Sequence, residues 1–257
     1  TLEASEAVYT AAFAQVKDHP YLNLLGLHCH FGSQIFETDG FALAAGKVMN
    51  KMGAWKQTHG FECSVLNLGG GFGIRYTEED KPLEPHVYVE EMIKSVQAEA
   101  EAVKLAMPEI WIEPGRSLVG AAGTSLYTVG SQKTVPGVRQ YIAVDGGMSD
   151  NIRPALYDAK YEAIIANKAN QAKDATYTVA GKLCESGDKL IIDAALQKAE
   201  SGDILAMFCT GAYGYSMASN YNRVPRPAVV FVEAGEHQLA IRRESYDDIV
   251  VNDLPLT

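Results

Sequence analysis

The chain has 257 residues, 47% hydrophobic and 21% charged, which is enough to bury a sizeable core in one or two globular domains. Its formal net charge of -10 argues against nucleic-acid and anionic-membrane binding, because both depend on dense positive charge. No apolar run approaches the roughly 20 residues of a membrane helix and no signal sequence opens the chain, so we expect a cytoplasmic protein that binds small molecules or other proteins.

Three helix–strand units are expected in the first half of the chain, because apolar residues recur there at helical spacing and each such stretch leads into a short apolar run. The helices are expected at residues 2–17, 40–59 and 84–106, and the strands that follow them at 24–27, 64–68 and 110–112. Short apolar strands separated by helices indicate a parallel sheet covered by helices.

The pattern changes after about Ser125, where β-rich runs separated by turn residues replace the helical stretches. These runs lie at residues 126–129, 141–144, 176–179 and 228–232. We therefore expect an α/β domain over residues 1–125 and a mainly β domain over residues 126–257.

Special clusters follow each of the three expected strands, at the end where parallel α/β folds bind ligands. His28 and His30 lie two residues apart on a strand and so share one face. The glycine run at residues 69–73 lets backbone N–H groups approach a phosphate, although a tight turn that needs positive φ explains it equally well. Residues 113–116 (EPGR) place a carboxylate and a guanidinium across a rigid turn, with a surface ion pair as the alternative.

A metal site at His28 and His30 would need a third ligand. None occurs at a recognisable spacing, so we expect no metal. The cysteines have no zinc-ribbon spacing either and are expected to be free thiols; they are Cys29, Cys63, Cys184 and Cys209.

Five motifs occur in order along nearly the whole chain: residues 26–34 (GLHCHFGSQ), 68–73 (LGGGFG), 113–116 (EPGR), 183–188 (LCESGD) and 211–213 (GAY). Together they resemble the fold-type III pyridoxal-phosphate decarboxylases, the family that includes diaminopimelate, ornithine and arginine decarboxylases. The resemblance implies that residues 1–125 are part of a (β/α)8 TIM-type barrel that binds the cofactor, followed by the β domain. One departure is Lys182, which stands where we expect proline.

Within the family, residues 151–157 (NIRPALY) and 219–222 (SNYN) look like the diaminopimelate branch. That likeness implies decarboxylation of meso-diaminopimelate to L-lysine and carbon dioxide. An ornithine- or arginine-type decarboxylase is the alternative within the family.

The resemblance also implies which residues bind pyridoxal 5'-phosphate. Glu113 would pair with the pyridine nitrogen, and a carboxylate there favours the protonated, electron-poor ring. His30 would stack on the ring. The phosphate would be bound by Ser33, Gly70, Gly71, Gly115 and Arg116, with Tyr213 closing over it.

Substrate binding is implied for residues that match the two charges of a diamino-dicarboxylate. Arginine forks suit carboxylates, and Glu185 would face the distal ammonium group. Cys184 would donate a proton to the carbanion left by carbon dioxide, and with His30 it forms the candidate catalytic pair. The remaining candidate substrate residues are Arg116, Arg153, Tyr157 and Tyr213.

The family places its cofactor-bearing lysine upstream of the His28 strand, and no lysine of this chain occupies such a place. We therefore expect a C-terminal portion of the enzyme that is inactive by itself. The alternative is a natural short paralogue that acts as a pyridoxal-phosphate-binding, regulatory or structural subunit. The resemblance also implies a small amino-acid substrate and a homodimer with shared active sites, because in the family the loop of Cys184 and Glu185 reaches the other subunit.

Overall fold

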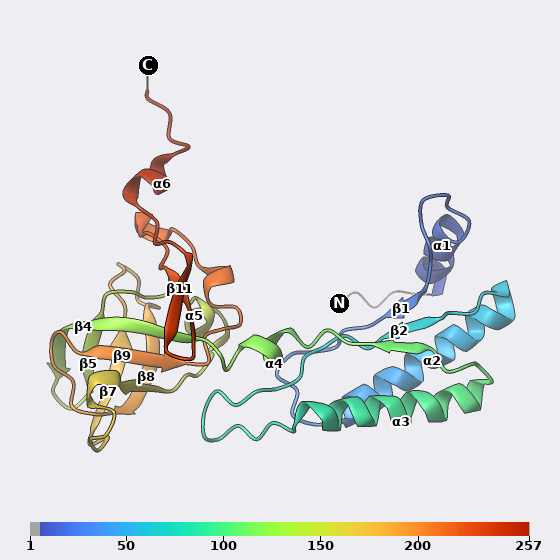
Figure 1. Cartoon of the computed structure of the whole chain (residues 1–257), viewed down its shortest axis with the longest axis horizontal. Helices are drawn as coiled ribbons and strands as arrows, with labels where there is room; N and C mark the ends of the chain where they lie inside the picture. The colour runs from blue at the N-terminus through green and yellow to red at the C-terminus, as the bar shows by residue number, and fades with distance from the viewer. Residues whose placement is uncertain (1–5, 257) are drawn as a thin grey trace. The chain divides into compact units, whose positions relative to one another are not determined.

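The structure is a computed structural model, and it describes residues 6–256. The chain packs into two compact units (Figure 1). Unit 1 comprises the described residues up to Ile74 together with Lys81–Leu118, and unit 2 comprises Arg75–Asp80 and the described residues from Val119 onward. Residues 75–80 thus belong to unit 2 although they interrupt unit 1 in sequence. The domain boundary expected between residues 125 and 126 stays a prediction.

Unit 1 contains the three expected helix–strand units around a parallel sheet with strand order β1-β2-β3. Residues 2–5 of the first expected helix lie outside the described residues. The helices are α1 (Glu6–Val16), α2 (Asp39–His59) and α3 (Pro85–Val103), the strands are β1 (Gly26–His28), β2 (Val65–Asn67) and β3 (Glu109–Trp111), and the short helix α4 (Gly115–Val119) follows β3.

One face of this sheet packs into the core of unit 1. Leu66 and Leu68 are fully buried, and Leu27 and Ile110 pack against the same cluster. Helices α2 and α3, which lie together along the sheet in Figure 1, supply most of its other side chains. Each large apolar side chain buried in this way stabilises the fold by about 1.5–3 kcal/mol. The fully buried residues of these two helices are Phe41, Ala45, Met49, Met52, Tyr88, Met92 and Val96.

The opposite face of the sheet carries polar and aromatic side chains, because successive residues of a strand point to opposite sides. The parallel register pairs His28 with Asn67 and Asn67 with Trp111, so these three residues form a row across the sheet. Each of the three is the last residue of its strand, so the row lies along the carboxyl edge of the sheet.

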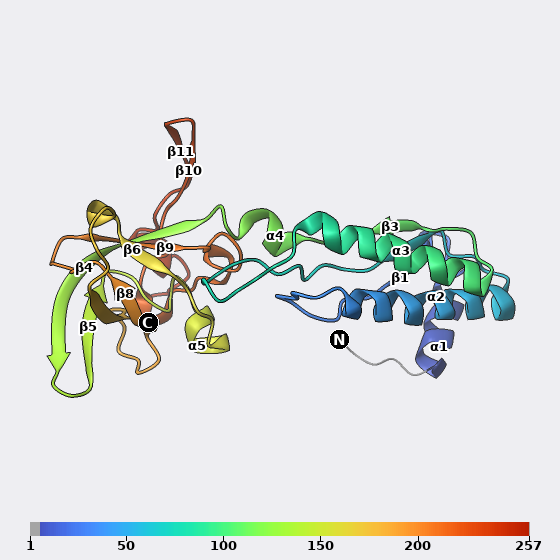
Figure 2. The same cartoon turned by 90° about the horizontal axis from the view of Figure 1, so that it is seen from below.

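Unit 2 is built on a six-stranded mixed sheet with strand order β6-β9-β4-β5-β7-β8. Only β5 and β7 pair in parallel; the other neighbours are antiparallel. A two-stranded hairpin, β10–β11, forms a separate sheet (Figure 2). The strands are β4 (Thr124–Val135), β5 (Arg139–Val144), β6 (Ala163–Ile165), β7 (Ala175–Ala180), β8 (Lys189–Leu196), β9 (Ile204–Phe208), β10 (Val229–Glu233) and β11 (Glu236–Ile241).

The expected β-rich runs lie in β4, β5, β7 and β10, which confirms the mainly β character of this region. The strands β6, β8, β9 and β11 were not expected. Short helices and helical turns connect these strands; they are α5 (Arg153–Tyr157), η1 (Ala166–Lys168), η2 (Tyr215–Met217), η3 (Tyr221–Arg223) and α6 (Tyr246–Val250).

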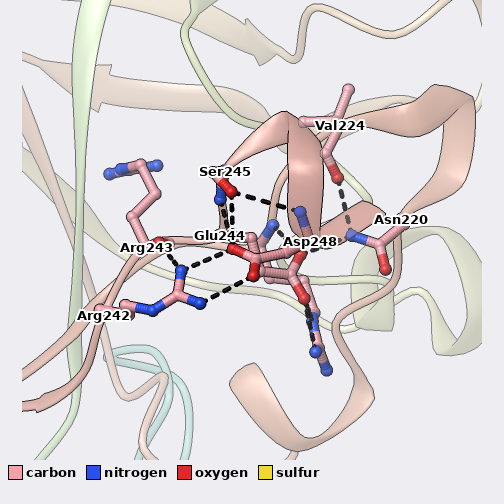
Figure 3. Close-up of polar contacts among 8 residues, drawn as sticks. Asn220, Val224, Arg242, Arg243, Glu244, Ser245 and Asp248 are labelled. Carbon is pink, nitrogen blue, oxygen red and sulfur yellow. Dashed lines mark hydrogen bonds and ion pairs between the residues drawn. The ribbon is translucent and has the colours of Figure 1, made fainter. Parts of the chain in front are cut away.

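A polar network anchors the C-terminal part of unit 2 (Figure 3). The Glu244 carboxylate accepts hydrogen bonds from the backbone N–H of Arg226 at 2.8 Å, from the Arg226 guanidinium at 2.8 Å, and from the Asn220 amide at 2.6 Å. Asp248 forms a bidentate pair with Arg242 and takes part in a capping box with Ser245 at the start of α6. These contacts fix the chain after the hairpin.

Candidate active site

In unit 1, backbone hydrogen bonds join the three motifs that follow β1, β2 and β3. The Glu113 N–H donates to the carbonyl oxygen of Gly69 at 2.8 Å, and the Ile35 N–H donates to that of Gly71 at 2.9 Å. The motifs, separate in sequence, therefore meet at one edge of the sheet, as expected for the carboxyl ends of parallel strands.

Glycine is required in this run because other backbone segments lie very close to it. A Cβ on Gly70 would lie 1.8 Å from the carbonyl oxygen of Glu113, and one on Gly71 would lie 2.3 Å from that of Gly32. Gly69 and Gly71 also have positive φ, 71° and 97°, which favours glycine. The turn explanation offered by the sequence is thus correct.

Glu113 lies on the open face of the sheet, where its side chain is 54% exposed. The Asn67 amide donates to one carboxylate oxygen at 2.8 Å, and His28 Nε2 lies 3.6 Å from the other. The carboxylate is therefore held at the edge of the sheet but remains accessible to a ligand.

Three further candidate residues lie in unit 1: His30, Ser33 and Arg116. His30 Nδ1 accepts a hydrogen bond from the Gly70 N–H at 3.4 Å, so the ring lies against the glycine run. Arg116 is 8% exposed and donates to the Ser33 hydroxyl at 2.9 Å. The guanidinium and the Glu113 carboxylate thus engage different groups, as a ligand-binding turn requires. Gly115 faces open space, with no atom within 4 Å of its Cβ position.

In unit 2, Arg153 is the centre of a second group of candidate residues. It is 8% exposed, and its guanidinium donates to the hydroxyl groups of Tyr76 and Tyr161, both at 3.0 Å. The ring of Tyr213 lies 5.8 Å from the guanidinium carbon, within cation–π range. Tyr213 has φ 59°, a costly backbone conformation for a tyrosine that surrounding structure must maintain. Tyr157 lies on the same helix as Arg153 and is 60% exposed.

Cys184 and Glu185 lie on a loop organised by Asp188. The Asp188 carboxylate is 4% exposed and accepts hydrogen bonds from the N–H groups of Met148 at 2.7 Å and Leu183 at 2.8 Å. Cys184 itself is exposed. The Gly187 N–H and other donors lower the pKa of Glu185, so this exposed carboxylate is ionised at neutral pH.

The other cysteines differ from Cys184. Burial raises the pKa of the Cys63 thiol to about 11 and raises the pKa of Cys29 and Cys209 as well. All four are free. Within the described residues, no group of three or more histidine, cysteine or acidic side chains could hold a metal ion. None of the helices described is long and apolar enough to cross a membrane.

Four polar residues that the sequence did not single out connect the expected ones. Asn67 contacts Glu113, Asp188 shapes the Cys184 loop, and Tyr76 and Tyr161 hold Arg153. Asn67 and Asp188 had a usable signal, since each lies within or next to a motif. The tyrosines had none, because their proximity to Arg153 depends on the fold.

Comparisons with known proteins show what the chain is similar to. Residues 4–120 match the pyridoxal binding domain of pyridoxal-dependent decarboxylases. Diaminopimelate decarboxylase of Bacillus subtilis (strain 168) is 63% identical over 244 residues, which cover 95% of this chain and 56% of that relative. The chain spans about half the length of the curated relatives it matches.

Solved structures show the same fold. Diaminopimelate decarboxylase from M. jannaschii in complex with L-lysine has a TM-score of 0.88 at 35% identity, covering 97% of this chain and 56% of that one. A lysine/ornithine decarboxylase from Vibrio vulnificus complexed with putrescine has a TM-score of 0.68 at 22% identity, covering 84% and 57%, and supports the fold alone. The expected fold, part of a (β/α)8 barrel followed by a mainly β region, is confirmed.

The cofactor of such proteins is pyridoxal 5'-phosphate, and the residues of unit 1 fit it. Because Gly70 has no Cβ, the glycine run packs directly against the backbone of Glu113. The Glu113 carboxylate is exposed beside this loop, where a ring nitrogen could be paired, and the buried Arg116 guanidinium suits a phosphate. By its sequence and its fold, the chain is similar to the pyridoxal-dependent decarboxylases over nearly its whole length.

Proposed function

We propose that this chain is part of an enzyme that decarboxylates meso-diaminopimelate to L-lysine and carbon dioxide. The observation that supports the proposal is the contact between the glycine run, proposed to bind the phosphate, and Glu113, proposed to pair with the ring nitrogen. Relatives named diaminopimelate decarboxylase support the substrate, as does the L-lysine in the M. jannaschii complex.

When bound, the cofactor supplies an electron sink that stabilises the carbanion left by carbon dioxide. Glu113 would pair with its ring nitrogen and favour the protonated ring, and His30 would lie against the ring. Ser33, Gly70, Gly71, Gly115 and Arg116 would bind its phosphate, and Tyr213 would close over it.

The substrate is held by its charges. Arg153 and Arg116 bind carboxylate groups, and Tyr157 and Tyr213 add hydrogen bonds or contact. The two tyrosine hydroxyl groups on Arg153 fix its planar fork, which matches a carboxylate bidentately. The ionised Glu185 attracts the distal ammonium group, and Cys184 donates the proton that completes the product.

The assembled enzyme is proposed to be a cytoplasmic homodimer in which the Cys184 loop of one subunit serves the site of the other. Exposure of Cys184 supports this arrangement, because a thiol that serves another subunit must lie at the surface. Its ligands are a small amino acid and the cofactor, and we propose no nucleic-acid or membrane partner.

The test measures carbon dioxide release from meso-diaminopimelate, ornithine and arginine by the product of the complete open reading frame. We expect turnover of meso-diaminopimelate only. In that enzyme Cys184→Ala should lower kcat by about 100-fold or more, a typical loss for a general acid, whereas Cys63→Ala should leave kcat unchanged. Preference for ornithine or arginine would overturn the substrate assignment.

The present chain, residues 1–257, is proposed to be inactive alone. Incubation with pyridoxal 5'-phosphate, reduction with borohydride and mass spectrometry test this directly. A stoichiometric pyridoxyl adduct on one lysine would contradict the proposal that no lysine here holds the cofactor. A folded protein without decarboxylase activity from the complete reading frame would instead favour a regulatory or structural subunit.

A further inference from the structure

Asn67 joins two parts of the candidate cofactor site. It is the last residue of β2, and its side-chain amide donates to Glu113 Oε1 at 2.8 Å. Its side-chain oxygen accepts the Gly69 N–H at 2.9 Å. One side chain therefore contacts both the ring-pairing carboxylate and the start of the glycine run.

The orientation of the Asn67 amide follows from its neighbours. A backbone N–H can only donate, so the group facing Gly69 must be the oxygen, and an ionised carboxylate can only accept, so the group facing Glu113 must be the nitrogen. Both bonds are satisfied by the same rotamer. Asparagine is thus suited to this position in a way that a residue with a single polar function is not.

The bond to Glu113 matters because that side chain is otherwise loosely held. Glu113 is 54% exposed, and its second oxygen has His28 Nε2 at 3.6 Å, beyond a good hydrogen bond. A glutamate with one oxygen fixed has far less rotational freedom, so its free oxygen keeps one direction. Hydrogen bonds to a charged acceptor are among the stronger ones in proteins.

We propose that Asn67 is a positioning residue for the cofactor: it aims the Glu113 carboxylate at the ring nitrogen and ties that carboxylate to the phosphate-binding glycine run. This inference rests on the proposed function, because it assumes that Glu113 faces the ring nitrogen. It goes further by naming the residue that sets the direction of that contact. The same residue connects the groups proposed to bind the ring nitrogen and the phosphate.

The test uses two probes that need no lysine: pyridoxamine 5'-phosphate, and its 1-deaza analogue, in which C–H replaces the ring nitrogen. The measurement is the ratio of their Kd values by titration calorimetry on the 257-residue chain. Both probes carry the phosphate, so the ratio reports the contact to the ring nitrogen alone. We expect the chain to prefer pyridoxamine 5'-phosphate by about tenfold or more, the effect of a hydrogen bond to a charged group.

The key variant is Asn67→Ser. A serine hydroxyl can still accept the N–H two residues further on, so the Gly69 bond is kept, but it is too short to reach Glu113. We expect the ratio to fall at least about threefold, with little change for the 1-deaza probe. The matched control is Asn50→Ser, which removes an amide bond to the Gly46 carbonyl on α2 and should leave the ratio unchanged.

A double-mutant cycle with Glu113→Gln completes the test. If Asn67 acts through Glu113, adding Asn67→Ser to Glu113→Gln should not change the ratio further. An equal loss for both probes in Asn67→Ser would show a merely structural contribution and overturn the inference. An unchanged ratio in Asn67→Ser would also overturn it while leaving the proposed function intact.

Failure of the proposed function has a different signature. A ratio near one in the unsubstituted chain, or no binding of either probe, would contradict the Glu113 assignment itself and the inference with it. Should Asn67→Ser not fold, exchange protection of the Asn67 side-chain amide can be followed by NMR in Glu113→Ala instead. Loss of that protection supports the contact, and unchanged protection overturns it.

Discussion

The glycine run of unit 1 and the candidate residues of unit 2 are positioned by opposite means. In unit 1, Gly70 allows the backbone of the glycine run to approach Glu113 so closely that a Cβ would lie 1.8 Å from its carbonyl oxygen. In unit 2, buried charged side chains organise the surrounding chain through hydrogen bonds. Arg153 and Asp188 are 8% and 4% exposed. The backbone approach in unit 1 thus depends on the absence of a side chain, whereas the contacts in unit 2 depend on the presence of one.

The largest effect is expected from Gly70→Ala. Its Cβ would meet a carbonyl oxygen rather than a flexible side chain, so the backbone after β3 must move. We expect a loss of about 3 kcal/mol or more in the free energy of unfolding, at the upper end for overpacking. Urea denaturation measures it, with Gly115→Ala as the control.

Gly115→Ala should behave in the opposite way. No atom lies within 4 Å of its Cβ position, and it begins helix α4. We expect no loss of stability and a gain of up to about 1 kcal/mol, because alanine costs less backbone entropy. Equal losses of unfolding free energy in Gly70→Ala and Gly115→Ala would contradict the claim that close backbone approach positions the glycine run.

The second prediction concerns Asp188→Ala. Removing this buried carboxylate leaves the N–H groups of Met148 and Leu183 without an acceptor, which should cost about 3 kcal/mol in the free energy of unfolding. Urea denaturation also checks this one. The exposed Asp174→Ala on the same unit should stay within about 0.5 kcal/mol, and a similar loss there would refute the reason given for Asp188.

A smaller effect is expected from Tyr161→Phe. It removes one of the two hydroxyl groups that accept from Arg153, while Tyr76 keeps the other. We expect a loss of about 1 kcal/mol by urea denaturation. Tyr157→Phe serves as the control, since that side chain is 60% exposed, and its stability should not change.

The smallest effect is a pH dependence that unit 2 should show through Glu244. The Arg226 side chain and other donors lower the pKa of Glu244 to about 2 from its usual 4.5. Because the folded pKa is the lower one, its stabilisation is complete above about pH 4.5 and is lost as the pH falls toward 2. Solvent screening at the partly exposed Arg226 limits it to about 1 kcal/mol.

Glu244→Gln tests this sign. The difference in unfolding free energy between the original chain and the variant, measured by urea at pH 6 and pH 2.5, should shrink on acidification. Subtracting the variant removes the contribution of the other carboxylates, including Asp248, whose pKa is also lowered by its pairing with Arg242. A difference that grows at low pH would reverse the assignment.

The sequence predicted much of unit 1, since its elements are local. Apolar spacing placed α2 (Asp39–His59) within a residue, and the strands followed from short apolar runs. In unit 2 the pattern was less informative. Strand β8 contains Ala-Ala-Leu and β9 contains Leu-Ala-Met, residues that favour helices. Pairing with β7 makes β8 extended, and pairing with the distant strand β4 makes β9 extended.

The candidate site residues show the same difference between local sequence patterns and distant contacts. The glycine run and Glu113 were recognisable because their motifs are contiguous. The partners that position them were not, since Asn67 and Glu113 lie 46 residues apart and Asp188 lies 40 residues from Met148. Residue type alone does not show which distant group a polar side chain will meet.

The short segment Arg75–Asp80 has a consequence for how such proteins can diverge. It lies between β2 and α3 in the gene but belongs to unit 2, where Glu78 N–H donates to Glu162 and Tyr76 accepts from Arg153. A single genetic crossover near residue 118 would therefore join Arg153 to a tyrosine from a different parent. Recombination keeps these contacts when both units come from the same parent. Chimaeras should therefore take residues 75–80 from the parent that supplies unit 2.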